Sequence, residues 1–171
     1  MIIDRAGYRL NVGIILVNAS GRVFWGRRSG HDAWQFPQGG LAAGENALEA
    51  MFRELQEEVG LTKEDVEVLA STKRWLKYRL PKQYLRHGSE PLVIGQKQKW
   101  FLIRFTGTDG DINIKTTHPE FDNWKWVNFD QLLADIIPFK LKLYKQVVYQ
   151  TLEFIKRELT SPETGFYSAL D

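Results

Sequence analysis

One segment, residues 39–61, constrains the fold of this chain more than any other part of the sequence. It reads GGLAAGENALEAMFRELQEEVGL. Pro37 and the glycines up to Gly44 disfavour regular structure, Asn46 is a suitable helix N-cap with Glu49 three residues later, and Gly60 suits a left-handed C-cap. We therefore predict a loop, a short helix and a second loop.

The predicted helix has an apolar side and an acidic side. Helical spacing places Leu48, Met51, Phe52, Leu55 and Val59 on one stripe, and it places Glu54, Glu57 and Glu58 on another face. Like charges three or four residues apart destabilise a helix by roughly 0.2–0.5 kcal/mol per pair, so a cation is expected to offset the repulsion. Carboxylate oxygens favour Mg²⁺ or Mn²⁺ that also contacts substrate phosphates. A solvated acidic face is the ordinary alternative, but a glycine-rich backbone that a phosphate can approach lies close by.

This segment resembles the Nudix box at every specified position. The frame is Gly39, five residues, Glu45, seven residues, Arg53, Glu54, Leu55, one residue, Glu57, Glu58, one residue, Gly60 and Leu61. The resemblance implies hydrolysis of a nucleoside diphosphate linked to another group. It also implies that Arg53 orients the glutamates, that Gly39 permits a turn, and that divalent metal is held by Gly39, Glu54, Glu57, Glu58 and Glu120.

The remaining chain contains further strand-like and helix-like segments. A hairpin is predicted from residues 11–18 and 22–27, and more strands are predicted at 34–36, 66–76, 97–105 and 123–128. A brief helix is expected at 130–134, followed by an interruption at Pro138 and a long helix at 140–158. This order indicates an α+β fold, and the resemblance implies a Nudix-type α/β/α sandwich with a mixed β-sheet between helices.

Length and composition restrict the class of protein. With 171 residues the chain is long enough for one ordinary domain, which we place at 7–159, followed by a loosely ordered tail at 160–171. The absence of cysteine excludes disulfides, thiolate metal sites and a cysteine nucleophile. No secretory signal is recognisable at the amino terminus, and no apolar run approaches the roughly 20 residues of a membrane helix. We expect a monomeric cytoplasmic protein without a membrane partner.

Motifs outside the box point to a narrower group. They are the Tyr8-Arg9 pair, WQFPQGG at 34–40, IGQKQKWFL at 94–102, PEFDNWKWV at 119–127, and Pro138-Phe139-Lys140. Together they resemble the bacterial RNA 5′-pyrophosphohydrolases, relatives of the plant-type dinucleoside polyphosphate hydrolases. The resemblance implies conversion of 5′-triphosphorylated RNA to 5′-monophosphorylated RNA with release of pyrophosphate, which starts 5′-end-dependent mRNA decay. Nucleotide polyphosphates are expected as side substrates, and a protein activator is compatible with this class.

Candidate substrate-binding residues are mainly cationic or aromatic, because phosphates need positive charge and unpaired bases stack on rings. We assign this role to Arg9, Arg28, Tyr78, Lys99, Phe139 and Lys140. The resemblance implies that Arg28 and Phe139 enclose a base near the 5′ end, whereas Phe139 taken alone fits core packing at a helix start. The basic run from Lys73 to Arg86 fits either an RNA backbone or a solvated surface.

Glu120 is the candidate general base. A carboxylate outside the acidic helix that faces the metals can bind another ion or accept the proton of the attacking water, although a loop glutamate is more often simply exposed. Two other functions remain open. The same site suits a hydrolase of diadenosine tetraphosphate, and a noncatalytic nucleotide-sensing Nudix module is the alternative from another class.

Overall fold

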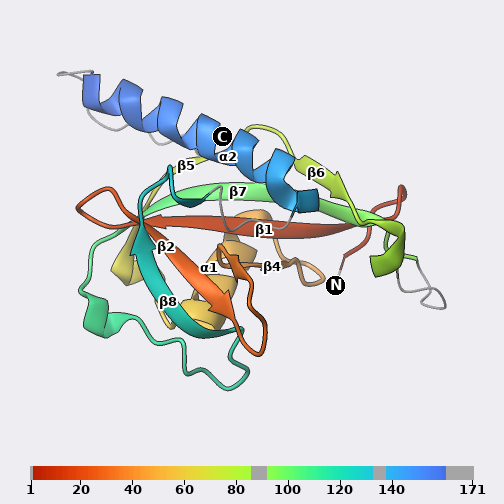
Figure 1. The fold of residues 1–171 in the computed structure, drawn as a ribbon, viewed down its shortest axis with the longest axis horizontal. Helices are drawn as coiled ribbons and strands as arrows, with labels where there is room; N and C mark the ends of the chain where they lie inside the picture. Colours follow the sequence, from red (N-terminus) through yellow and green to blue (C-terminus); the bar gives the residue numbers. More distant parts are fainter. Residues whose placement is uncertain (1, 86–91, 133–137, 161–171) are drawn as a thin grey trace.

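The computed structural model describes residues 2–85, 92–132 and 138–160 (Figure 1). The strands are β1 (Tyr8–Val17), β2 (Val23–Arg28), β3 (Trp34–Gln35), β4 (Gln38–Gly40), β5 (Val66–Ser71), β6 (Leu76–Arg79), β7 (Gly95–Phe105) and β8 (Phe121–Val127). The α-helices are α1 (Ala47–Val59) and α2 (Pro138–Thr160), and the 3₁₀ turns are η1 (Lys63–Asp65), η2 (Lys82–Tyr84) and η3 (Asp109–Asp111).

All the strands belong to one mixed sheet whose central path is β3-β2-β1-β7-β5. β1 and β7 pair in parallel along their length, from Tyr8 opposite Gly95 to Val17 opposite Arg104, and the other strand pairs are antiparallel. The predicted hairpin of β1 and β2 forms, but its strands share only the register pair Val17 and Val23. Beyond that pair they diverge, and β1 then pairs with β4 while β2 pairs with β3 and β8.

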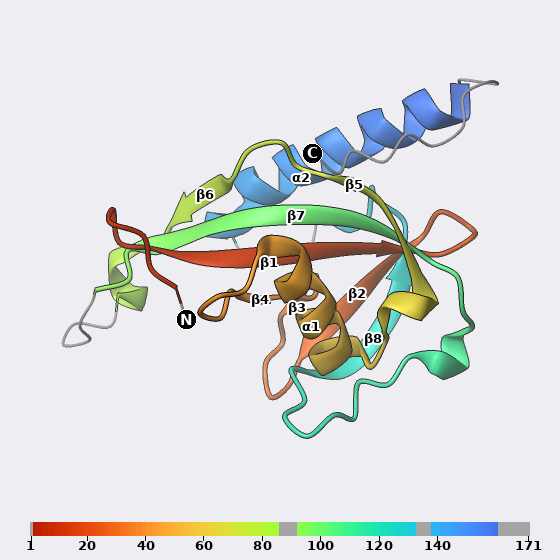
Figure 2. The ribbon, with the colours of Figure 1, turned by 180° about the vertical axis from the view of Figure 1, so that it is seen from behind.

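The sheet lies between two helical layers. In β1, Ile14 and Leu16 join the core beneath α1, whereas Ile15 and Val17 join the core beneath α2. This alternation is expected of a strand that is buried on both faces. Figures 1 and 2 show α1 and α2 on opposite sides of the sheet. The predicted α/β/α sandwich with a mixed sheet is confirmed.

Residues 66–76 do not form one strand, so that prediction is wrong. β5 and β6 both pair with β7, but the chain advances five residues between Ser71 and Leu76 while their partners on β7 are three residues apart. The extra residues leave the ladder. Thr72 keeps this connection on the sheet, because its backbone N–H donates to the Trp100 carbonyl at 2.9 Å and its Oγ1 accepts from the Trp100 backbone N–H at 3.1 Å.

The observed bounds of β4 and α2 also differ from the predicted ones. The glycine-rich loop contains a strand, since Gln38–Gly40 pairs with β1 as β4. α2 begins at Pro138 rather than after it, because a proline is well suited to the first turn, where its missing N–H is not needed. The second half of the predicted helix at 130–134 and the tail beyond Thr160 lie outside the described residues, so the domain limits of 7–159 stay a prediction.

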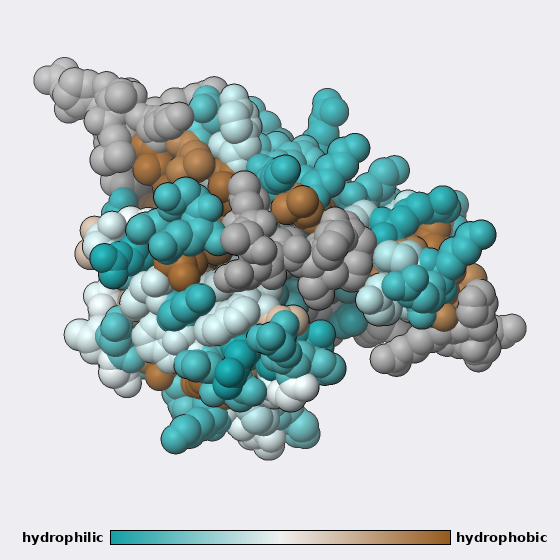
Figure 3. Space-filling view, in the orientation of Figure 1, coloured by the Kyte–Doolittle hydropathy of each residue, from teal (hydrophilic) through white to brown (hydrophobic). Residues whose placement is uncertain are grey.

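The surface over the α2 side is mainly hydrophilic. In Figure 3 the visible apolar atoms form separate patches rather than one continuous area. In the described part of the chain, no helix is both long and apolar enough to cross a membrane.

Candidate active site

α1 is positioned by the predicted caps. Asn46 Oδ1 accepts from the backbone N–H groups of Leu48 at 2.9 Å and Glu49 at 3.0 Å, while the Glu49 carboxylate accepts from the Asn46 N–H at 2.8 Å. Gly60 ends the helix with a φ of 76°. The capping box and the left-handed C-cap are therefore confirmed.

The acidic side of α1 is not uniformly solvated. Glu54 and Glu58, one turn apart, are each only 8% exposed, while the side chain of Glu57 is 58% exposed. Met51 and Leu55 pack into the core on the adjoining side of the helix. Two of the three carboxylates therefore lie at the edge of the buried interface between α1 and the sheet.

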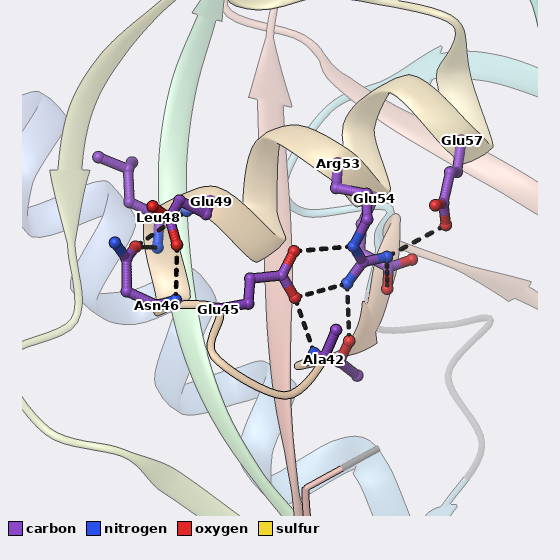
Figure 4. A network of polar contacts seen from close by, with 9 residues as sticks. Ala42, Glu45, Asn46, Leu48, Glu49, Arg53, Glu54 and Glu57 are labelled. Carbon is purple, nitrogen blue, oxygen red and sulfur yellow. Dashed lines mark hydrogen bonds and ion pairs between the residues drawn. The ribbon is translucent and has the colours of Figure 1, made fainter.

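Arg53 offsets the repulsion between Glu54 and Glu57 (Figure 4). Its Nε and Nη2 donate to the two oxygens of Glu45 at 2.8 and 2.9 Å. Nη1 donates to Glu54 at 2.8 Å and to Glu57 at 3.1 Å, and Nη2 also reaches the Gly40 carbonyl at 2.8 Å. The guanidinium thus joins the acidic side of α1 to β4 and to the loop before the helix.

The Glu54 carboxylate packs directly against the backbone of Gly39. A Cβ atom at this position would lie 1.8 Å from the carboxyl carbon of Glu54, so only glycine fits. Gly39 is paired with Val12 inside β4 and is not among the glycines with positive φ. The expected role in a turn is therefore wrong, and the glycine is needed for close approach instead.

Burial and mutual repulsion disfavour the ionised forms of the inner carboxylates. Burial raises the pKa of Glu54, and the hydrogen bond from Arg53 opposes that rise. Burial also raises the pKa of Glu58 well above its usual range, although its Oε2 accepts from the Gln38 backbone N–H at 3.0 Å. The nearby charges of Glu120, Glu54 and Glu57 add to the effect on Glu58. Such a site favours a bound cation.

Glu120 approaches from the other half of the sheet. Its Oε1 accepts from Arg28 Nε at 3.1 Å and from Gln35 Nε2 at 3.2 Å. A register shift between Arg27 and Arg28, where β2 pairs with β8, lies next to this ion pair. A β-bulge changes the direction of a side chain in this way. Glu120 is therefore held in place rather than merely exposed.

Lys140, near the start of α2, lies close to Glu120, Arg28 and Glu58. Burial and the charge of Arg28 lower the pKa of Lys140 to about 8, while Glu120 and Glu58 oppose that change. Arg28, Glu120, Lys140 and Glu58 therefore form one electrostatic cluster, drawn from β2, the segment before β8, α2 and α1.

The other predicted substrate residues divide into two groups. Arg9 lies against β4, where a Cβ atom on Gly40 would be 2.4 Å from Arg9 Nη2, and the charge of Arg9 acts on both Glu54 and Tyr78. Arg9 and Tyr78 therefore lie on the β4 and Glu54 side of the site. Lys99 instead donates to the Lys73 carbonyl at 3.4 Å, in the β5–β6 connection. The side chain of Phe139 and the end of the basic run at Arg86 lie outside the described residues.

The donor set fits a hard divalent cation. Among the described residues, no three carboxylate or imidazole side chains already form a closed metal-binding cluster. Arg53 holds Glu54 and Glu57, while the Gln38 backbone holds Glu58. The set nevertheless consists of oxygen ligands, which Mg²⁺ and Mn²⁺ prefer. It is also partly buried and negatively charged, and a bound cation would relieve the repulsion between its carboxylates.

Comparison with known proteins assigns the family. The model of the NUDIX domain matches residues 7–147. The chain belongs to the Nudix family. Among its relatives, the RNA pyrophosphohydrolase of Legionella pneumophila (strain Corby) is 63% identical over 163 residues, which cover 95% of this chain and 93% of the relative. The RNA pyrophosphohydrolase of Psychrobacter sp. (strain PRwf-1) is 50% identical over 166 residues, covering 95% and 96%.

Solved structures support the Nudix fold. The binary complex of a C. elegans Ap4A hydrolase superposes with a TM-score of 0.65 at 19% identity, covering 86% of this chain and 98% of the other. The E. coli dihydroneopterin triphosphate pyrophosphohydrolase superposes with a TM-score of 0.64 at 21% identity, covering 84% and 98%.

Three contacts of this Nudix domain were not predicted from the sequence. Glu45 was recognised only as a box position, yet it forms the two-pronged pair with Arg53. Gln38 donates its backbone N–H to Glu58, and Gln35 donates its side-chain amide to Glu120. Both glutamines belong to the WQFPQGG motif, so the motif marked the right segment without indicating what its amides do.

Proposed function

We propose that this Nudix enzyme hydrolyses 5′-triphosphorylated RNA to 5′-monophosphorylated RNA and pyrophosphate, and thereby starts 5′-end-dependent mRNA decay. The proposal rests on the 63% identity, across 95% of the chain, to a protein named RNA pyrophosphohydrolase. The candidate site supports the proposal, because it brings together carboxylates and cations, the kinds of group that phosphoryl transfer uses. We further propose that the enzyme is a cytoplasmic monomer, with nucleotide polyphosphates as side substrates and a protein activator as an additional partner.

Nudix hydrolases generally depend on a divalent metal, and we propose Mg²⁺ here, with Mn²⁺ as a substitute. Gly39, Glu54, Glu57 and Glu58 would hold it, while Glu120 would either bind a further ion or act as the base, and we assign it the second role. When bound, the metal neutralises phosphate charge and acidifies a water molecule.

Side chains of the protein accept the proton and balance the phosphate charge. Both recorded donors to Glu120 engage Oε1, and no described residue donates to Oε2. We assign Oε2 as the acceptor of the proton from the attacking water, while pyrophosphate leaves with the electron pair of the broken P–O bond. Arg28 and Lys140 balance phosphate charge beside it. Arg9, Tyr78, Lys99 and Phe139 remain proposed contacts to the rest of the RNA.

A comparison of hydrolysis rates on two substrates tests the proposed function. Initial rates are measured with Mg²⁺ on a triphosphorylated RNA several nucleotides long and on diadenosine tetraphosphate. We expect the RNA to have the higher kcat/KM. A large preference for the dinucleotide would replace RNA with that substrate class, and RNA binding without product would indicate a noncatalytic sensor.

Glu57→Gln tests the metal site. Because Glu57 is exposed and offers a carboxylate beside Glu54 and Glu58, its replacement is expected to lower kcat by about a hundredfold or more, with RNA affinity within about threefold of wild type. Turnover and binding of labelled RNA are measured separately. Glu67→Gln is the control, because this half-exposed carboxylate on β5 pairs with Arg104 rather than with the site, and its kcat should match wild type. Near-normal turnover of Glu57→Gln with Mg²⁺ would contradict the assignment.

A further inference from the structure

A row of side-chain amides runs from the candidate base into the core on the α2 side of the sheet. Gln35 Nε2 donates to Glu120 Oε1 at 3.2 Å, and Gln35 Oε1 accepts from Gln38 Nε2 at 3.5 Å, the longest link. Gln38 Oε1 accepts from Gln98 Nε2 at 3.2 Å. Gln98 Oε1 in turn accepts from the Trp100 indole Nε1 at 3.1 Å. The row crosses from β3 to β4 to β7, and we call these four residues the amide relay.

The two ends of the relay set the same direction, because the Trp100 indole can only donate and the ionised Glu120 carboxylate can only accept. An indole N–H can only donate, so Gln98 must present its oxygen to Trp100 and its nitrogen to Gln38. Gln38 must then present oxygen to Gln98 and nitrogen to Gln35. The same step repeats once more, and it leaves the Gln35 nitrogen facing Glu120. Reversing any one amide would place two donors or two acceptors against each other.

The anchor of the relay cannot easily change its orientation. Gln98 is fully buried and Trp100 is 2% exposed. The Trp100 ring lies against Gly13, where a Cβ atom would come within 2.6 Å of the ring carbons. Phe36 and Tyr144 contact the ring edge to face, with centroids 5.6 and 5.4 Å away. The indole N–H is therefore fixed by packing, and water does not compete for it at the buried amide.

We propose that the amide relay orients Glu120 for proton removal, with Gln35 as the positioning residue that contacts it. A donor held against Oε1, together with Arg28, leaves Oε2 as the basic atom. Without the contact from Gln38, only Glu120 itself orients the Gln35 amide, so the amide and the carboxylate that it contacts are less firmly held. Gln98 and Trp100 reach Glu120 only through Gln38 and Gln35. This inference rests on the proposed role of Glu120, but not on the identity of the RNA substrate.

A double-mutant cycle tests the relay. Gln98→Met keeps the side-chain length but removes both hydrogen-bonding ends, and Gln35→Met disconnects the relay from Glu120. kcat and KM are measured for both single variants and for the double variant, on whichever substrate the wild type cleaves faster. Asn11→Ala is the matched control, because Asn11 is a buried amide directly opposite Gln98 in the parallel ladder but outside the relay.

We expect Gln98→Met to lower kcat by about three- to tenfold, the effect of one hydrogen bond, with KM within about twofold of wild type. In the Gln35→Met background the same change should alter kcat by less than about twofold, because the rest of the relay then no longer reaches Glu120. Asn11→Ala should leave kcat within about twofold, because Asn11 Oδ1 accepts no hydrogen bond from any described residue and is not part of the relay.

An equal fall in kcat in both backgrounds would overturn the proposal, and so would a fall matched by Asn11→Ala. If Gln98→Met is too unstable to purify, Trp100→Phe replaces it in the cycle, since it keeps a ring but removes the N–H. Wild-type cleavage of RNA is recorded first, so failure of the relay and failure of the proposed substrate give different results.

Discussion

At the scale of single residues, the candidate site depends on space as much as on charge. Gly39 is the clearest case, because the Glu54 carboxylate occupies the volume that a side chain would need. Glu58 shows a second kind of constraint, since its burial works against its own ionisation. Lys140 shows a third, since the site lowers its pKa towards the physiological range.

Gly39→Ala is expected to lower kcat by about a hundredfold, because the methyl group must displace the Glu54 carboxylate, and a metal ligand moved by an ångström loses most of its effect. Steady-state kinetics with Mg²⁺ measure it. Gly110→Ala is the control, since its nearest contact would be an ordinary 3.7 Å. Equal activity of both variants would show that Glu54 can move without consequence.

Glu58→Gln is expected to stabilise the metal-free protein at neutral pH while abolishing turnover. The pKa of Glu58 is raised in the folded protein, so between the unfolded and folded values only the folded form holds the proton. Stability therefore falls as pH rises through that window, and a side chain that cannot ionise avoids the loss. Each kcal/mol recovered raises Tm by about 2–4 °C for a chain of this size. Glu57→Gln, at an exposed position, should show no comparable gain.

The lowered pKa of Lys140 predicts that substrate binding depends on pH. With a pKa of about 8 in the free enzyme, the side chain loses its charge as the pH rises past that value. KM for RNA should then increase by roughly tenfold between about pH 7 and about pH 9, following the charged fraction. Lys140→Arg stays charged, so its KM should vary little over that range. Parallel curves for the two enzymes would argue against a phosphate contact at this residue.

At the scale of elements, α1 was predicted well because its signals are local. Its N-cap, its C-cap and its apolar stripe lie within one continuous segment, and each acts through neighbours in sequence. The connection between β5 and β6 was missed for the opposite reason. Whether residues 72–75 stay on the sheet depends on β7, which lies far along the chain.

Asn46→Ala tests whether the N-cap of α1 contributes to stability without contributing to catalysis. Loss of the cap is expected to lower the free energy of unfolding by about 1 kcal/mol, since two backbone N–H groups lose their acceptor. kcat should stay within about twofold, because Asn46 lies at the opposite end of the helix from Glu58. Urea denaturation and kinetics measure the two effects. Asn46→Asp retains the acceptor and should match wild type in both.

At the scale of the whole molecule, the fold class could be inferred from the order of elements, but the strand order could not. Periodicity does not show that β1 leaves β2 after Val17, or that β7 inserts in parallel beside β1. The Glu120–Arg28 pair and the amide relay depend on that arrangement, because each joins segments that only the sheet brings together. The box motif indicated the chemistry, whereas the folded chain supplies the contacts around it.

The divergence of β1 from β2 has a consequence for ligand design. Arg28, Gln35 and Glu120 belong to the β2-β3-β8 side, and Gly39, Glu54 and Glu58 belong to the β1-β4-α1 side, while the β1–β2 ladder joins the two sides only at Val17 and Val23. The Gln35–Gln38 contact and the core beneath α2 still tie the two sides together, because each contains residues from both sides. An inhibitor with one group for each side therefore meets two sets of contacts at a separation that the fold has already set, whereas one that contacts a single side uses only half of the site.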